Sequence, residues 1–187
     1  MDLLKFAAYC AYLAAWLVFA LAAAAGALPR LRRQNQPALE SGMTPPVFLG
    51  TLLQVLGAFV LTGSMGSGPL RARPVELAGA LLFAPAGAAV FVWALRSAPK
   101  NTGADRLVTT GAYQWLRHPI YLAFLAMLLA TGLLLSAGPK LLLSIALYIG
   151  GSELRIASEE AELAERFPEE FARFRRQTRW RYLPGLR

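Results

Sequence analysis

Residues 117–140 read RHPIYLAFLAMLLATGLLLSAGPK, and this stretch decides the fold of the chain. It holds the only histidine, His118, at the entrance to an uncharged apolar run. A membrane-spanning helix needs roughly 20 such residues. Pro119 suits the first position of a helix, and Gly138-Pro139 marks a break, so the stretch predicts a spanning helix that ends in a tight turn. Cationic and aromatic groups at such an entrance need a reason, and we favour a bound anionic cofactor.

The composition indicates an integral membrane protein with a single domain, residues 1–187. Of its 187 residues, 56% are hydrophobic and only 16% are charged, whereas soluble domains carry about a quarter charged residues. The net charge of +8 could suggest nucleic acid. Cytoplasmic loops of membrane proteins are basic anyway, so we expect a lipid bilayer and no nucleic acid as partner. The single cysteine excludes an internal disulfide.

The fold class predicted is an all-α integral membrane protein with five transmembrane helices. The fourth and fifth helices are expected to form a hairpin, and the charged segment Ala157–Gln177, split by Pro168, an amphipathic helix on the cytosolic side. Residues 1–98 would hold the first three spans, and residues 99–187 the cofactor-binding loop, the hairpin and the C-terminal helix. The expected spans are Phe6–Leu28, Pro46–Thr62, Val75–Leu95 (with a kink at Pro85), Pro119–Ser136 and a last one from near Lys140 past Ser152.

Basic residues set the expected orientation. If the chain crosses the membrane five times, most of the 19 Lys and Arg residues lie on one side of the membrane. That side includes all the arginines from Arg155 onward. Because loops rich in Lys and Arg stay in the cytoplasm, the N-terminus should lie outside and the C-terminus in the cytosol. We therefore expect a multi-pass protein of the cell or inner membrane, with its site on the cytosolic side.

The hairpin brings two polar segments together. His118 and Ser158 lie equally far from Gly138 on its two sides, so antiparallel helices of equal rise would place them side by side. Arg117, His118 and Tyr121 should therefore face the segment Arg155–Glu160. Arg155 is also expected near the membrane boundary with Glu153 close by, and ionisable residues there are functional candidates by default.

The cluster so assembled carries both signs of charge. The N-terminus of the helix that begins at Pro119 attracts an anion, and Arg117 and His118 add positive charge there. Glu159 and Glu160 supply negative charge opposite. A ligand with a carboxylate, an ammonium and a ring would match this set, and S-adenosyl-L-methionine is such a ligand.

Three blocks of sequence follow one another at the spacing of this hairpin. They read Gly111-x-Tyr113 through Arg117-His118-Pro119-x-Tyr121, then Arg155-x-x-x-Glu159-Glu160-x-x-Leu163, then Phe167-x-Glu169-Glu170 and an aromatic residue. Together the blocks resemble the isoprenylcysteine carboxyl methyltransferase family, over about residues 107–184. The phospholipid N-methyltransferases look like more distant relatives, with a similar His-Pro and Glu-Glu arrangement.

The resemblance implies a multi-span methyltransferase that uses S-adenosyl-L-methionine and methylates a lipophilic acceptor, with isoprenylcysteine-type O-methylation of a carboxylate as the first expectation. Arg155 matches an arginine expected to orient the acceptor, and Arg179 or Arg181 resembles an arginine found before a final proline. The cofactor-binding candidates are Gly111, Tyr113, Arg117, His118, Tyr121, Glu159 and Glu160. The catalytic candidates are Arg155 and His118, and the substrate-binding candidates are Arg155, Arg179 and Arg181.

The sequence departs from the family pattern at a few positions. Ala123 and Pro168 stand where glycines are usual, and Phe171 and Phe174 replace tyrosines. The two lost hydroxyls bear on the acceptor more than on the cofactor.

Two other readings stay open at this point. A membrane ene-reductase of the sterol reductase type also carries a His-Pro-x-Tyr element and uses NADPH, and a non-catalytic accessory protein would need the cluster only as capping and interfacial charge. The expected partner is a lipophilic small molecule or prenylated substrate that enters from the bilayer, and no metal is expected. The sequence does not choose the acceptor, O- or N-methylation, or the oligomeric state.

Overall fold

The computed structural model describes residues 3–32, 44–62, 72–97, 107–183 and 185. Within these ranges the chain forms six α-helices and one short 3-10 helix, and no strand. In chain order they are α1 (Leu3–Arg32), α2 (Pro45–Thr62), α4 (Pro74–Ser97), η1 (Gly111–Gln114), α5 (Pro119–Leu134), α6 (Pro139–Arg166) and α7 (Pro168–Gln177).

Every predicted span coincides with a helix. Three segments are long and apolar enough to cross a membrane, namely Lys5–Ala25, Pro74–Ser97 and Pro139–Arg166. The other two apolar helices, Pro45–Leu61 and Pro119–Leu134, are shorter. Within the described residues the all-α fold is therefore confirmed, with three helices long and apolar enough to cross a membrane, while the count of five spans and the orientation stay predictions. Of the charges that argued for the orientation, five lie outside the described residues: Arg33, Arg71, Lys100, Arg106 and Arg187.

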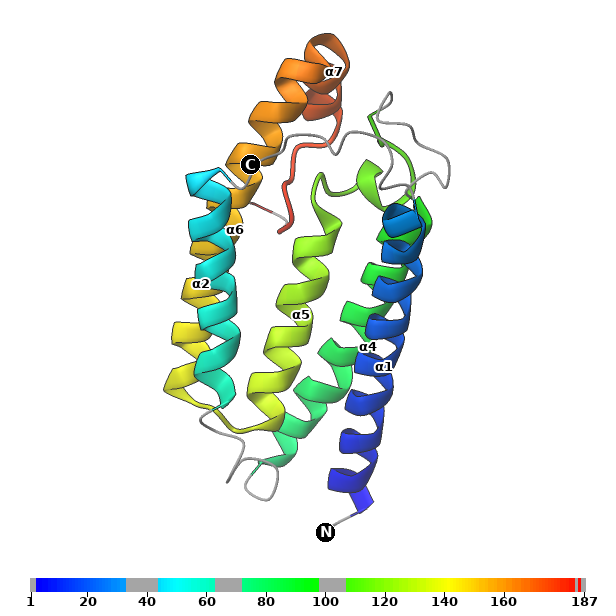
Figure 1. Ribbon diagram of the computed structural model, residues 1–187. Coiled ribbons are helices and arrows are strands. Elements are labelled where there is room, and N and C mark those ends of the chain that lie inside the picture. Colours follow the sequence, from blue (N-terminus) through cyan, green and yellow to red (C-terminus); the bar gives the residue numbers. More distant parts are fainter. Residues whose placement is uncertain (1–2, 33–43, 63–71, 98–106, 184, 186–187) are drawn as a thin grey trace.

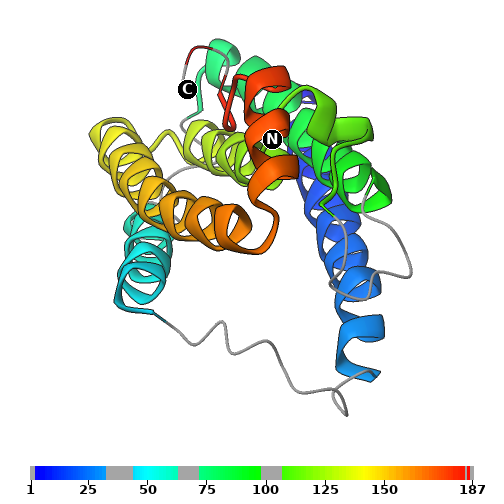
Figure 2. The ribbon, with the colours of Figure 1, turned by 90° about the horizontal axis from the view of Figure 1, so that it is seen from above.

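Helix α5 lies between two helix pairs (Figures 1 and 2). On one side α4 packs along α5 and is itself covered by α1, and on the other side α2 packs along α6. The rings of Phe19 and Phe91 stack with centroids 3.8 Å apart between α1 and α4. Small residues such as Ala84 and Ala123, both fully buried, let α4 and α5 approach closely. This packing fixes the end of α5 that carries the predicted site.

The predicted C-terminal helix is divided differently from our expectation. Residues 157–166, which we assigned to a separate amphipathic helix, continue the last span without a break as part of α6. The split at Pro168 is confirmed, because Pro168 occupies the first turn of α7 and Glu169 and Glu170 follow it there. Span four ends at Leu134, two residues before the predicted Ser136, which has a positive φ of 48° in the turn.

Glycines bring α2 and α6 into backbone contact. A Cβ atom on Gly151 would lie 2.4 Å from the carbonyl oxygen of Gly50, and a Cβ on Gly50 would lie 2.6 Å from that of Gly151. About two helical turns further along α2, the Ser144 hydroxyl of α6 donates a hydrogen bond of 2.6 Å to the carbonyl of Gly57. Small residues at such crossings are the usual means of close helix packing in membranes.

We predict that Gly151→Ala destabilises the protein while Gly150→Ala does not. The Cβ at position 151 would force the helix backbones apart, and overpacking of this kind costs about 1–3 kcal/mol. A Cβ on Gly150 meets nothing within 4 Å, and alanine is the better helix former by about 1 kcal/mol. Thermal unfolding of the two purified variants in detergent measures the difference. Equal melting temperatures would contradict the close crossing.

Candidate functional site

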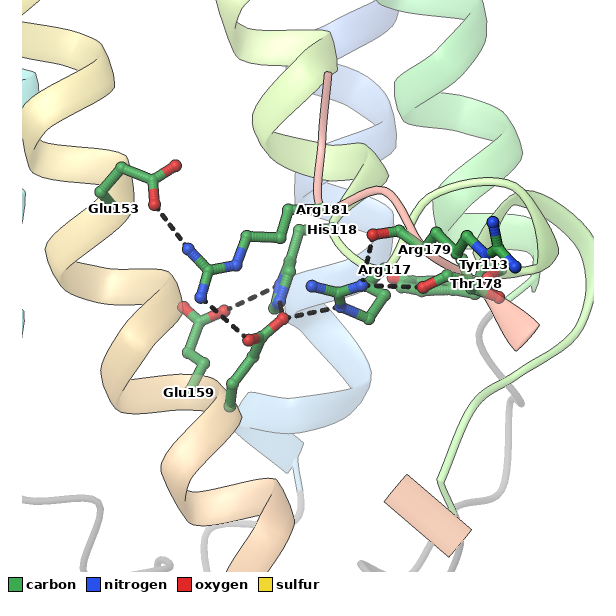
Figure 3. A network of polar contacts seen from close by, with 9 residues as sticks. Tyr113, Arg117, His118, Glu153, Glu159, Thr178, Arg179 and Arg181 are labelled. Carbon is green, nitrogen blue, oxygen red and sulfur yellow. Dashed lines mark hydrogen bonds and ion pairs between the residues drawn. The ribbon is translucent and has the colours of Figure 1, made fainter. Parts of the chain in front are cut away.

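The fold-back of α5 and α6 brings a buried carboxylate of α6 against the side chains of Arg117, His118 and Arg181, which are labelled in Figure 3. Glu160 of α6 has only 6% of its side chain exposed. Its Oε1 lies 2.7 Å from Arg117 Nε and 3.3 Å from His118 Nε2, and its Oε2 lies 3.2 Å from Arg181 Nη2. The predicted meeting of Arg117 and His118 with the paired acids is confirmed.

The Arg117 side chain bonds to the protein through its Nε and its Nη1. Besides its bond to Glu160, its Nη1 donates to the carbonyl oxygens of Thr178 and Arg179 at 2.7 and 2.9 Å. Backbone hydrogen bonds run from Arg117 N to the carbonyl of Trp180 and from His118 N to that of Arg181. Arg117 therefore pins the C-terminal segment beside the start of α5, which makes it a structural member of the site.

His118 lies between the two acids. It precedes α5 as the N-cap residue, and its Nδ1 lies 3.5 Å from Glu159 Oε2 while its Nε2 faces Glu160. A carboxylate at each ring nitrogen favours the doubly protonated imidazolium, since both nitrogens can then donate. Burial alone would lower the pKa of His118, but the hydrogen bonds and charges of Glu159 and Glu160 outweigh it and raise the pKa above its ordinary value.

Glu159 belongs to a more open part of the site. Its side chain is 38% exposed, it accepts a hydrogen bond from the Tyr121 hydroxyl, and its Oε1 lies 3.6 Å from Arg155 Nη2. The Arg155 guanidinium also lies over the Tyr121 ring, 5.6 Å from the centroid. The expected approach of Tyr121 to the segment that begins at Arg155 is confirmed, and the two adjacent acids have different surroundings.

The structure distinguishes the two arginines, Arg179 and Arg181, that the sequence left unresolved. Arg181, not Arg179, places its guanidinium in the cluster, whereas Arg179 contributes its carbonyl oxygen to Arg117. Glu153, which we expected beside Arg155, forms its hydrogen bond of 2.6 Å with Arg181 Nη1 instead. Arg155 Nη1 donates at 3.1 Å to Gln54 of α2, a residue that our sequence analysis did not single out.

Gly111 and Tyr113 fix the loop before α5 and lie at the edge of the charged cluster. Gly111 has a φ of +64°, and a Cβ there would lie 2.2 Å from Ser97 Oγ, so only glycine fits. The same hydroxyl accepts a hydrogen bond from Ala112 N at 3.0 Å. The Tyr113 carbonyl accepts a bond of 3.4 Å from the Thr178 hydroxyl. These contacts tie the loop to α4 and to the C-terminal segment.

Four buried polar atoms around the cluster have no hydrogen-bond partner among the residues that the structure describes. They are Glu153 Oε1, Arg155 Nε, Arg181 Nε and Tyr182 Oη. Buried polar groups are nearly always paired, and exceptions call for an explanation such as an absent ligand or water. A hollow of about 410 Å³ lined by Arg117, Arg175, Arg176 and Arg179 opens beside the same cluster. The site therefore has both unused polar atoms and room for an anionic group.

The raised pKa of His118 predicts a pH-dependent stability. Protonated His118 stabilises the folded state fully below the ordinary pKa of about 6.5, and this contribution is lost as the pH rises through the higher pKa of the folded state. We expect the melting temperature of the wild type, relative to His118→Gln, to fall as the pH rises from 6.5 into the alkaline range. Thermal unfolding of both proteins across this range is the measurement. Parallel curves would contradict the carboxylate contacts of His118.

The comparisons agree with this geometry. The model of the isoprenylcysteine carboxyl methyltransferase (ICMT) family matches residues 77–165. A search of curated proteins finds no match for the chain. The matched segment runs from the first turn of α4 to the last turn of α6 and contains the facing residues of the α5–α6 hairpin, while α1, α2 and α7 lie outside it. The resemblance predicted from the sequence is thus confirmed: residues 77–165 match a family of membrane methyltransferases, the isoprenylcysteine carboxyl methyltransferases.

Proposed function

We propose that the chain is an S-adenosyl-L-methionine-dependent methyltransferase that acts on a lipophilic acceptor, most simply the carboxylate of an isoprenylcysteine. The observation that carries this proposal is the meeting of Arg117-His118-Pro119-x-Tyr121 with Glu159-Glu160 across the α5–α6 hairpin. The whole arrangement lies within the segment that matches the family.

The surroundings of the two acids suggest different roles toward the cofactor. Glu160 already meets three cationic side chains and is buried, so we assign it to holding the site together. Glu159 is more exposed and lies beside Tyr121 and His118, which suits an acid that contacts the ammonium of the cofactor. The arginine-lined hollow and the N-terminus of α5 suit its carboxylate. The unpaired polar atoms of the cluster fit a ligand with both charges.

The proposed chemistry asks the protein mainly for positioning. S-adenosyl-L-methionine, when bound, supplies a methyl group on a sulfonium that is already activated, and a carboxylate acceptor needs no base. Arg155 would bind and orient that carboxylate, and holding two reactants in line supplies much of the rate enhancement of such a transfer. The C-terminal segment, held over the hairpin by Arg117 and Arg181, would keep water from the site.

The position of the site supports an acceptor that arrives from the bilayer. The cluster lies at the end of α5 where the apolar helix begins, beside the charged half of α6 (Figures 1 and 3). A lipophilic chain could lie along the apolar helices while its polar end reaches Arg155. The cofactor would enter from the opposite, charged side, which we propose to be the cytosol.

We predict that the wild-type protein binds S-adenosyl-L-methionine in isothermal titration and that His118→Ala abolishes binding. Glu159→Gln should weaken binding at least tenfold, because the neutral amide cannot form an ion pair with the ammonium. The matched control is Glu162→Gln on the same helix, whose carboxylate pairs with Arg166 on the surface and should be dispensable. Glu160 is best tested as Glu160→Gln, which keeps a carbonyl acceptor for buried Arg117, since alanine would leave the guanidinium with no side-chain acceptor there and destabilise the fold more.

The same titration separates the other readings. Heat of binding with NADPH and none with S-adenosyl-L-methionine would favour the ene-reductase reading. A folded wild type that binds neither cofactor would favour an accessory protein. Equal affinity of the His118 and Glu162 variants for S-adenosyl-L-methionine would place the cofactor somewhere else.

A further inference from the structure

Gln54 is a polar side chain of α2 that reaches the site from outside the segment matching the family. Its Nε2 donates to Ser152 Oγ at 3.0 Å, and its Oε1 accepts from Arg155 Nη1 at 3.1 Å. Both partners belong to α6. Gln54 is the only amide in α2, whose 18 residues carry no charge. A polar residue inside such an apolar helix is costly unless it bonds across to a neighbour, and Gln54 does so twice.

The glycine crossing of α2 and α6 places Gln54 at this distance. A Cβ on Gly50 would lie 2.7 Å from Arg155 Cγ, and a Cβ on Gly151 would lie 2.9 Å from Gln54 Cγ. The two side chains therefore occupy the space that the missing Cβ atoms leave. Because the backbones themselves are in contact there, the Gln54 amide has little freedom to move away from Arg155.

Arg155 differs from the other two arginines of the cluster in how its charge is balanced. Arg117 and Arg181 each bond to a carboxylate at hydrogen-bond distance, 2.7 Å to Glu160 and 2.6 Å to Glu153. Arg155 meets its acid, Glu159, only at 3.6 Å, which is too long for a good hydrogen bond. Among the residues that the structure describes, its one close side-chain acceptor is the neutral amide of Gln54, and its buried Nε, like that of Arg181, has no partner there.

A neutral acceptor orients a guanidinium without cancelling its charge. The Gln54 oxygen holds Nη1 from one side and the Tyr121 ring lies under the guanidinium, 5.6 Å from its carbon, so the direction of the group is set. The remaining donors keep their capacity for an anion. A carboxylate at position 54 would hold the group equally well and remove that capacity.

We propose that Gln54 is a positioning residue that holds the Arg155 guanidinium, still charged, for an anionic acceptor group, and that its neutral amide makes the site selective for carboxylate acceptors. This inference rests on the proposed methyl transfer and extends it to a helix that the family match does not cover. Gln54 acts through Arg155 and Ser152, and no direct contact with the acceptor is required.

The test is steady-state methyl transfer by the full chain in lipid nanodiscs. The acceptor is an S-farnesylcysteine derivative with a free carboxylate, and S-adenosyl-L-methionine affinity is measured beside it. For Gln54→Glu we expect the acceptor KM to rise at least tenfold while cofactor affinity and melting temperature stay near wild type. For Gln54→Leu we expect kcat/KM to fall at least tenfold, with cofactor affinity again unchanged. The matched control is Thr51→Val, because the Thr51 hydroxyl donates only within α2, to the Val47 carbonyl at 2.8 Å.

If Gln54 has a purely structural role, the opposite result is expected for Gln54→Glu, namely an unchanged acceptor KM. The carboxylate would strengthen the bond to Arg155 and activity would be kept, so an unchanged acceptor KM overturns the inference. The inference is also overturned if Gln54→Glu weakens cofactor affinity by the same factor as acceptor binding. The effect would then not act through Arg155. If the wild type neither binds the cofactor nor transfers methyl groups, the proposed function fails and this inference with it. If the wild type is fully active and Gln54→Glu leaves the acceptor KM unchanged, the inference about Gln54 fails while the proposed function stands.

Discussion

The Glu160 carboxylate joins three parts of the chain that are far apart in sequence. It accepts from Arg117 and faces His118 at the start of α5, it belongs to α6, and it binds Arg181 of the C-terminal segment. With 6% of the side chain exposed, these interactions are little screened by water. Removing one member of such a buried group leaves the others uncompensated, which costs about 3–5 kcal/mol. This carboxylate is therefore the point at which the start of α5, α6 and the C-terminal segment are held together.

Helical geometry explains why neighbouring acids have unlike roles. Adjacent residues on an α-helix point about 100° apart, so Glu159 and Glu160 cannot face the same partners equally. Glu160 faces Arg117 and the C-terminal segment, whereas Glu159 faces Tyr121 and the guanidinium of Arg155. His118 contacts both acids because each of its ring nitrogens meets one of them. The histidine therefore connects the structural half of the site to the more exposed half.

The sequence predicted the parts of the structure that depend on local pattern. Uncharged runs located the five apolar helices, Pro119 and Pro168 marked two helix starts, and the symmetric spacing about Gly138 placed His118 opposite the paired acids. The contact of Gln54 with Arg155 could not be read in this way, because it depends on which helix packs against α6. The signals that could have found it are the glycines at positions 50, 57 and 151 and a lone amide in an apolar helix. The choice between Arg179 and Arg181 was equally hidden, since both lie in an irregular segment whose side chains follow no period.

The three arginines of the site show how a charge that is at least partly buried can serve stability or binding. Arg117 and Arg181 are neutralised by carboxylates at close distance, and their places define the fold of the C-terminal segment. Arg155 is held by a neutral amide and an aromatic ring, with its acid at 3.6 Å and its Nε unpaired. A fold selected for stability alone would bring a carboxylate within hydrogen-bond distance of its guanidinium. Sites that keep an incompletely paired charge do so where a ligand completes the pairing, so the least satisfied arginine is the one best suited to meet a substrate.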